Sequence, residues 1–223
     1  MESEREKMGH EAMKFFEENK FVAVIRTSSA EDAEQMSNAV TSAGVKILEI
    51  TMSIPQALRV IENWSKREGV LVGAGTVTDG EMAQRAINAG ARFLSSHYAD
   101  RDVMSVGKNN NVLLIQGAVT PTEAVNAWQM GADLVNLYPV EFFGGPGYLR
   151  ALKGPLPFVK FMASGDITLE NAFDYLKYAC AVALNHSFFD RSLIRSNNWT
   201  EIAERTRQIT QKLEGLKVAK NPG

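Results

Sequence analysis

The sequence lacks the features of several large protein classes. It has a single cysteine, Cys180, inside an apolar run, which excludes a scaffold of paired disulfides. It has no basic block, and 24 Lys and Arg against 26 Asp and Glu leave a formal net charge of −2. No nucleic-acid or anionic-membrane partner is therefore expected. No apolar stretch approaches the roughly 20 residues that span a bilayer. A hydrophobic content of 45% also excludes a disordered chain.

The N-terminal segment does not resemble a sorting signal. Residues 1–20 are acidic and helix-like. A secretory signal would have an apolar core, and a transit peptide would be rich in Arg and Ser. We therefore expect a cytoplasmic protein, or an organelle protein if a presequence has been removed.

Short apolar runs alternate along the chain with longer amphipathic segments. The eight runs are 21–26, 45–51, 69–76, 91–96, 111–117, 133–139, 158–164 and 180–185. Helical patterns lie between them, for example at 30–44, 78–90 and 120–131. Thr120 and Pro121 show how such a helix would begin, with an N-cap residue followed by proline at the first helical position. Continuous apolar runs are typical of parallel strands that are buried on both faces.

Eight such units predict an α/β fold, a TIM (β/α)₈ barrel with an extra N-terminal helix. Each unit would take about 28 residues, at the lower end for this fold. We expect one domain over 1–223, with an N-terminal helix in 1–20 (helical pattern 3–19), the barrel in 21–216 and a tail in 217–223. The helical pattern at 198–216 would close the barrel. An open doubly wound sheet is the alternative, but no GxGxxG motif follows the first run.

Polar side chains stand where the apolar runs end. In a barrel of this kind, the chemistry lies at the carboxyl ends of the strands. These positions therefore predict the site. The candidates are Arg26, Glu49, Thr51, Ser53, Thr76, His97, Gln116, Asn136, Ser164, Gly165, Asp166, His186 and Ser187.

Glu49 is the most unusual of these residues because it lies between Leu48 and Ile50 in a core strand. An unpaired charge there would be very costly. One interpretation is a structural pairing with a lysine or arginine at the barrel mouth. The other is a general acid or base whose pKa is raised by burial.

The histidines and the cysteine do not form a metal-binding pattern. His97 and His186 both follow strands, but no HxH or HExxH spacing occurs. Both could equally be hydrogen-bonded surface groups. Cys180 stands early in its strand, which favours packing over nucleophilic use. We predict no metal and no cofactor, with a divalent cation kept as the alternative.

Several motifs resemble those of one enzyme family. LEIT (48–51), GAGTVT (73–78), GAVTPTEA (117–124), YPVEFFGG (138–145), KGPLPFVKF (153–161) and ASGDIT (163–168) follow one another in order. This set resembles the 2-keto-3-deoxy-6-phosphogluconate (KDPG) and 4-hydroxy-2-oxoglutarate (KHG) aldolases over about residues 20–215. The resemblance implies a TIM barrel, usually a homotrimer. It also implies cleavage of 2-oxo-4-hydroxy acids to pyruvate and an aldehyde through a lysine Schiff base.

The resemblance also assigns roles to residues. Glu49 matches the family's proton-shuttling glutamate, and Arg26 matches an arginine that holds an anionic substrate group. Thr76 matches a pocket threonine. Ser164 stands where a threonine binds the pyruvyl carboxylate, and Ser187 matches a serine that contacts phosphate.

The Schiff-base lysine is the main departure from the family pattern. The matching position is Asn136, whose amide nitrogen is not nucleophilic. Lys46 has the opposite strand parity to Glu49 and should point outward. Lys160 lies four residues before Ser164, about 13 Å lower, and belongs near the barrel bottom. Neither lysine is expected to replace the missing one.

The phosphate-binding segments depart as well. Asp166 would repel a phosphate dianion unless it is paired, and His186 and Leu184 stand where glycines are expected. Gln116 replaces a pocket proline. These replacements are polar, which indicates a changed site more than an empty one.

The first hypothesis is a carbon–carbon lyase that acts on a small 2-oxo acid and forms pyruvate. Arg26 and Ser164 would hold the carboxylate, and Glu49 would transfer a proton through water. Asn136, Gln116 or His186 would polarise the ketone. The weakened phosphate site favours an unphosphorylated acid such as 4-hydroxy-2-oxoglutarate, or oxaloacetate undergoing decarboxylation. The second hypothesis is a non-catalytic protein that binds a carboxylate metabolite.

Overall fold

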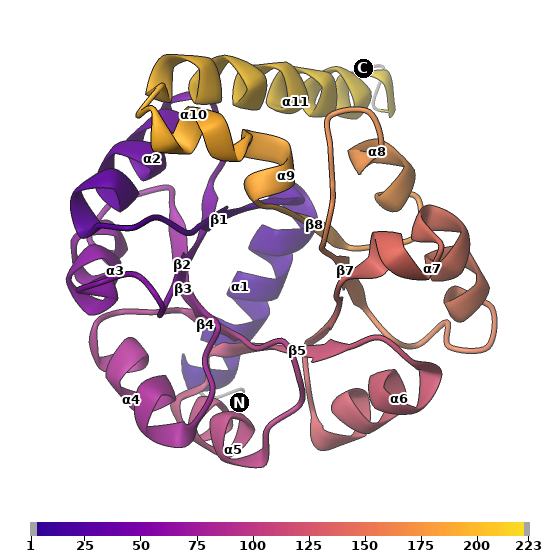
Figure 1. The fold of residues 1–223 in the computed structure, drawn as a ribbon. Coiled ribbons are helices and arrows are strands. Elements are labelled where there is room, and N and C mark those ends of the chain that lie inside the picture. The colour runs from indigo at the N-terminus through magenta and orange to yellow at the C-terminus, as the bar shows by residue number, and fades with distance from the viewer. Residues whose placement is uncertain (1–3, 221–223) are drawn as a thin grey trace.

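The computed structural model describes residues 4–220. Within them, eight parallel strands form a closed barrel in sequence order, and β8 pairs with β1 (Figure 1). The strands are β1 Phe21–Ile25, β2 Ile47–Thr51, β3 Leu71–Gly75, β4 Phe93–Ser95, β5 Leu113–Ala118, β6 Leu134–Leu137, β7 Phe161–Ala163 and β8 Ala181–Leu184. The predicted (β/α)₈ barrel is confirmed.

Helices surround the strands and complete the predicted units (Figure 1). They are α2 Ala30–Ser42, α3 Ala57–Ser65, α4 Gly80–Asn88, α5 Arg101–Asn110, α6 Pro121–Met130, η1 Val140–Phe143 (a 3₁₀ helix), α7 Gly145–Lys153, α8 Ala172–Tyr175, α9 His186–Phe189, α10 Arg191–Arg195 and α11 Trp199–Lys220. α6 begins with the predicted Thr120 cap, in which Glu123 completes a capping box. α11 extends past the predicted end at 216, so the helix includes part of the expected tail, and 221–223 lie outside the described residues.

The strands are shorter than the apolar runs that predicted them, most clearly at the seventh. The run begins at Phe158, but only Phe161–Ala163 forms β7. The N–H of Val159 bonds to the carbonyl of Leu156, so residues 156–159 form a turn at the start of the run. Phe158 accordingly lies outside the sheet and is 53% exposed.

The N-terminal helix α1, Glu4–Asn19, closes the bottom of the barrel. Figure 1 shows it lying across the centre of the ring. Phe16 is fully buried and meets Phe93 of β4 edge to face, with ring centroids 5.2 Å apart. Glu17 accepts a hydrogen bond of 2.9 Å from Lys160 Nζ. Lys160 therefore lies at the bottom of the barrel, as its distance from Ser164 predicts.

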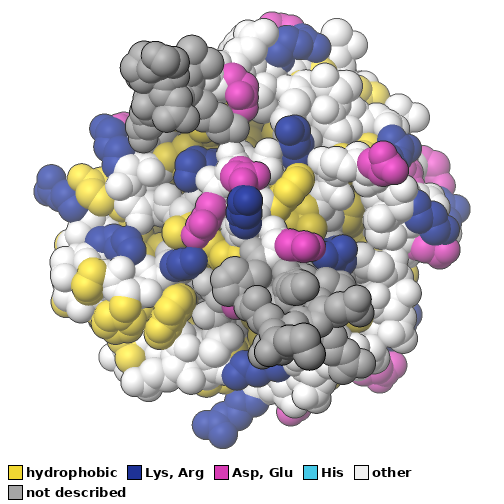
Figure 2. Space-filling view, turned by 180° about the vertical axis from the view of Figure 1, so that it is seen from behind, with side chains coloured by type: hydrophobic (Ala, Val, Ile, Leu, Met, Phe, Trp, Pro, Cys, Tyr) yellow, Lys and Arg dark blue, Asp and Glu magenta, His cyan; other side chains and the backbone are white. Residues whose placement is uncertain are grey.

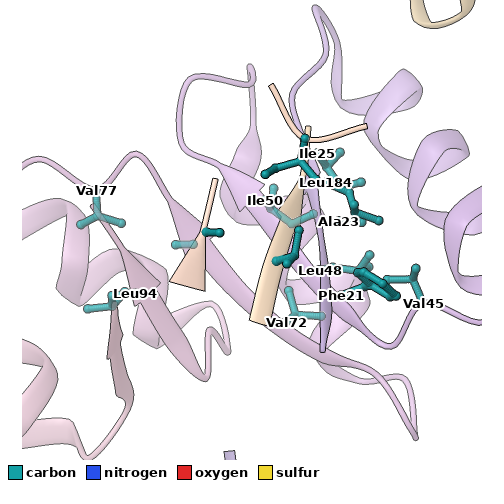
Figure 3. Close-up of a cluster of buried hydrophobic side chains, with 14 of the residues drawn as sticks. Phe21, Ala23, Ile25, Val45, Leu48, Ile50, Val72, Val77, Leu94 and Leu184 are labelled. Atoms are coloured by element: carbon teal, nitrogen blue, oxygen red, sulfur yellow. The ribbon is translucent and has the colours of Figure 1, made fainter. Parts of the chain in front are cut away.

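The strands are buried on both faces. Inward side chains such as Val22, Ile47 and Phe93 pack with Phe16 inside the barrel. The alternate side chains form a second core between the strands and the helices, which includes Leu48 (Figure 3). This period of two determines which residues can reach a site inside the barrel.

Two glycines of β3 leave room inside the barrel. A Cβ atom on Gly73 would lie 2.3 Å from the ring of Phe93. A Cβ atom on Gly75 would lie 2.1 Å from Oε1 of Glu49. Since real Cβ atoms do not approach so closely, any side chain at either position would displace its neighbour. The GAG segment thus makes space for the floor of the barrel and for the Glu49 carboxyl group.

The face behind the view of Figure 1 is of mixed charge. Figure 2 shows Lys and Arg side chains interspersed with Asp and Glu side chains over the described part of this face. Among the described residues, no helix combines the length and the apolar character needed to cross a membrane.

The packing of α1 predicts the effect of removing its central aromatic ring. We expect Phe16→Ala to lower the free energy of unfolding by about 3–5 kcal/mol, because it opens a cavity next to Phe93. The matched control, Phe158→Ala, should change it by less than about 0.5 kcal/mol, since that ring is exposed. Urea unfolding followed by tryptophan fluorescence measures both values, and equal losses would contradict the role assigned to α1.

Candidate functional site

A cavity of about 890 Å³ opens at the carboxyl ends of the strands. Seven of the predicted site residues line it, and each comes from the end of a different strand or from the segment that follows that strand. They are Arg26, Glu49, Thr76, His97, Asn136, Ser164 and His186. The other lining residues are Val24, Thr27, Ser28, Asp32, Tyr138, Ala183, Asn185, Arg191, Ile194, Arg195 and Asn197.

Glu49 lies in the interior of the barrel and is 4% exposed. Burial raises the pKa of its carboxyl group to about 7, although the Ser95 hydroxyl and the Arg26 cation act in the opposite direction. The ion pairs of the described residues do not include Glu49. The structural ion pair with a lysine or arginine is therefore not seen among the described residues, and the acid–base role of the carboxyl group stays a prediction. Near neutral pH this group can both accept and donate a proton.

Asn136 of β6 and Ser164, which follows β7, form a hydrogen-bonded pair that lines the cavity. The Ser164 hydroxyl donates a 2.7 Å hydrogen bond to Oδ1 of Asn136. The Nδ2 group of Asn136 has no hydrogen-bond partner among the described residues. Because Asn136 lines the cavity, this amide offers its N–H groups to a bound molecule. The arrangement therefore supplies a hydrogen-bond donor to the cavity.

Arg26 is held over the cavity by hydroxyl groups. Its Nη2 donates to Thr76 Oγ1 at 2.9 Å, and its Nη1 donates to Ser53 Oγ at 3.2 Å. Behind it, Thr51 Oγ1 lies 3.2 Å from Ser53 Oγ and donates to the carbonyl of Ile25. Thr51 and Ser53 do not line the cavity. They instead support the guanidinium group that does.

Thr76 has an unusual backbone conformation, with φ at 58°. A β-branched residue in the left-handed region is an outlier that costs of order 1–3 kcal/mol. This conformation brings the Thr76 hydroxyl to Arg26 and lets the residue line the cavity. The local strain is thus located at the group that orients the guanidinium.

Both predicted histidines line the cavity. The His97 ring meets Tyr138 edge to face with centroids 4.6 Å apart, and burial together with Arg26 lowers its pKa. His186 Nε2 lies 2.8 Å from Nη2 of Arg191. Burial, with Arg191, lowers the pKa of His186 as well. Both rings are therefore neutral at pH 7, and His186 accepts the hydrogen bond from the arginine.

Asp166 and Ser187 bond to each other and do not line the cavity. The Ser187 hydroxyl donates to Asp166 Oδ1 at 2.5 Å. Gly165 precedes them with φ at 96°, and a Cβ atom there would lie 2.7 Å from Cα of Pro139. The carboxylate of Asp166 therefore accepts the hydrogen bond of the Ser187 hydroxyl, which is the group that the sequence resemblance assigns to phosphate binding.

Gln116 lies on the outer face of β5 and does not line the cavity. Its Oε1 accepts a hydrogen bond from the backbone N–H of Asp100, and its Nε2 donates to the carbonyl of Ile115. Ile115 occupies the inward position, so strand alternation turns the next side chain outward. Gln116 thus ties the β4–α5 connection to β5 and is not placed to polarise a ketone.

The sequence analysis missed the contribution of α10. Arg191, Ile194 and Arg195 line the cavity from this short helix. The segment lies between the last apolar run and the last helical pattern, where no element was predicted. The sequence signal that could have predicted this helix face is the pair Arg191 and Arg195, which stand four residues apart shortly after the last strand.

Potential metal ligands and the single thiol of the described residues lie as follows. No group of three or more His, Cys, Asp or Glu side chains is placed to hold a metal among the described residues. Cys180 packs against the interior of the barrel, and burial raises the pKa of its thiol. The cavity lining offers the carboxyl groups of Glu49 and Asp32, two neutral imidazoles, hydroxyl groups, amides and arginines.

Comparison with known proteins gives a consistent result. The model of the KDPG and KHG aldolase family matches residues 12–205. The 2-dehydro-3-deoxy-phosphogluconate aldolase of Haemophilus influenzae is 31% identical over 196 residues, which are 86% of this chain and 92% of the relative. The KHG/KDPG aldolase of Escherichia coli is 27% identical over 199 residues, 88% of this chain and 92% of the relative.

A solved structure extends this likeness to three dimensions. KDPG aldolase from Legionella pneumophila, which holds pyruvate as a covalent carbinolamine intermediate, superposes with a TM-score of 0.79. The two are 28% identical, and the match covers 88% of this chain and 97% of the Legionella chain. With the barrel, the cavity at its mouth and the buried Glu49 in place, these matches show that the chain belongs to the KDPG and KHG aldolase family.

Proposed function

We propose that this protein is a carbon–carbon lyase that releases pyruvate from a small 2-oxo acid without a lysine imine. The family supports an aldolase-type lyase. The observation that carries the finer claim is that none of the lysines in the described part of the chain lines the cavity. Asn136 stands at the position of the family's lysine and donates hydrogen bonds instead of forming a covalent bond.

In the proposed reaction, Asn136 stabilises charge on the substrate's ketone oxygen. Deprotonation of the substrate's 4-hydroxyl group by Glu49, through water, breaks the C3–C4 bond. The electron pair moves to the 2-oxo group, which gives an aldehyde and the enolate of pyruvate. The Nδ2 donor of Asn136 then faces the developing oxyanion, and Ser164 orients that amide by occupying its Oδ1. Glu49 returns the proton to C3, and Arg26 binds the substrate's carboxylate.

The substrate we propose is unphosphorylated. Asp166 accepts a hydrogen bond from the Ser187 hydroxyl. A carboxylate therefore stands where the resemblance places a phosphate group, and the two negative charges would repel each other. 4-Hydroxy-2-oxoglutarate fits these conditions. Decarboxylation of oxaloacetate would pass through the same enolate of pyruvate and is the second reaction to assay. Binding of such acids without turnover would instead support the non-catalytic hypothesis.

Reductive trapping tests the absence of an imine. We expect incubation with pyruvate and borohydride to leave the mass of the intact protein unchanged, because Asn136 cannot form a Schiff base. A family member that has the lysine serves as the positive control and should gain the reduced pyruvyl group. A covalent adduct on any lysine of this chain would contradict the proposed route.

Glu49→Gln tests the proton transfer. We expect kcat for pyruvate release to fall by about 10²–10⁴-fold, while the control Glu68→Gln, at an exposed site, keeps full activity. The reaction begins with the deprotonated carboxylate, so wild-type kcat/KM should rise with pH through about 7. A lactate-dehydrogenase-coupled assay measures both. Full activity of Glu49→Gln would contradict the assignment.

We also propose that the protein is a homotrimer, as the family resemblance implies. Phe142 is 75% exposed, and Phe143 and Tyr98 are each about half exposed, so large apolar side chains remain for an interface. Light scattering should give three times the chain mass of 24.6 kDa. Phe142→Asp should lower that mass, whereas Phe158→Asp should not. A wild-type monomer would contradict the proposal.

A further inference from the structure

The outer part of the cavity is rich in cationic groups. Arg26, Arg191 and Arg195 line it, and the acidic lining residues are Asp32 and the buried Glu49. Proton transfer uses Glu49, and the proposed carboxylate site uses Arg26. The two arginines of α10 have no part in either role.

The geometry of α10 directs three side chains to the cavity. Arg191, Ile194 and Arg195 stand at positions i, i+3 and i+4 and therefore share one face of the helix. All three line the cavity. Asp190 caps this helix, because its carboxylate accepts from the backbone N–H and the hydroxyl of Ser192. The cap positions the cationic face of α10 at the cavity rim.

Neither arginine of α10 has an acidic partner among the described residues. Arg191 donates to the neutral His186, and Arg195 makes no hydrogen bond or ion pair in this part of the chain. Like charges four residues apart on a helix repel each other. A bound anion would relieve this repulsion, and an arginine guanidinium can bind carboxylate or phosphate oxygens with two parallel hydrogen bonds.

We infer that Arg191 and Arg195 bind a second anionic group, a terminal carboxylate or phosphate, on a substrate whose 2-oxo end lies at Asn136. This inference rests on the proposed function and names the residues that would select a 2-oxo acid with a second anionic group over one without it. A volume of about 890 Å³ has room for an acid longer than pyruvate. The Ser187 hydroxyl is hydrogen-bonded to Asp166 at the ends of β7 and β8 and is not free to bind an anion. We therefore place the second anion site on α10.

Binding measurements on matched variants test this site. Isothermal titration would compare pyruvate, which has one anionic group, with 2-oxoglutarate and KDPG, which end in carboxylate and phosphate. The proteins are wild type, Arg191→Gln/Arg195→Gln and the control Arg150→Gln, whose side chain is exposed on α7. We expect wild type and control to bind at least one two-anion acid more than about tenfold more tightly than pyruvate. The double variant should lose that preference and keep its affinity for pyruvate.

The results separate this inference from the proposed function. Equal wild-type affinity for all three acids, or an unchanged preference in the double variant, would overturn the α10 site and leave the lyase proposal standing. An arginine-dependent preference without pyruvate release from any 2-oxo acid would support the site and contradict the lyase. A preference confined to KDPG would support the site, identify phosphate as its group and contradict the unphosphorylated substrate proposed above. Absence of binding by all three acids would overturn both.

Discussion

Closure of the barrel is the constraint on which the rest of the structure depends. Pairing of β8 with β1 leaves no free sheet edge and points every second side chain of each strand toward one axis. The bottom of that axis is filled by Phe93 and by Phe16 of α1. Only the upper layer remains open, and polar groups from distant parts of the sequence meet there. The cavity therefore exists because the strands form a closed hydrogen-bonded ring, and α1 closes the bottom of that ring.

Burial in that ring gives Glu49 its chemical character. The side chain occupies space that Gly75 leaves free, in an interior whose low polarity raises the pKa of the carboxyl group to about 7. Arg26 limits this rise and is itself held by Thr76 and Ser53. An acid–base group and the cation beside it are thus positioned by the same layer of the barrel.

Three hydrogen-bonded pairs of side chains form at the carboxyl ends of the last three strands. Asn136 is paired with Ser164, Asp166 with Ser187, and His186 with Arg191. In each pair a donor meets an acceptor. Among the described residues, the Ser37 hydroxyl on α2 is the fully buried side-chain polar atom that lacks a partner, whereas the unpartnered Nδ2 group of Asn136 belongs to a residue that lines the cavity. The three pairs hold Asn136, Asp166 and His186 in place.

The sequence by itself determined the fold and the main members of the site. Eight apolar runs separated by helical patterns predicted the barrel, because local periodicity records burial on both faces of a strand. The polar residues at the ends of these runs include seven of the residues that line the cavity. Tertiary structure decided what periodicity cannot record. It turned Gln116 outward, joined Asp166 to Ser187 and brought α10 with Arg191 and Arg195 over the cavity. The physical reason is that strand alternation and the path of a short connection set the direction of a side chain, and these are defined only when the ring closes.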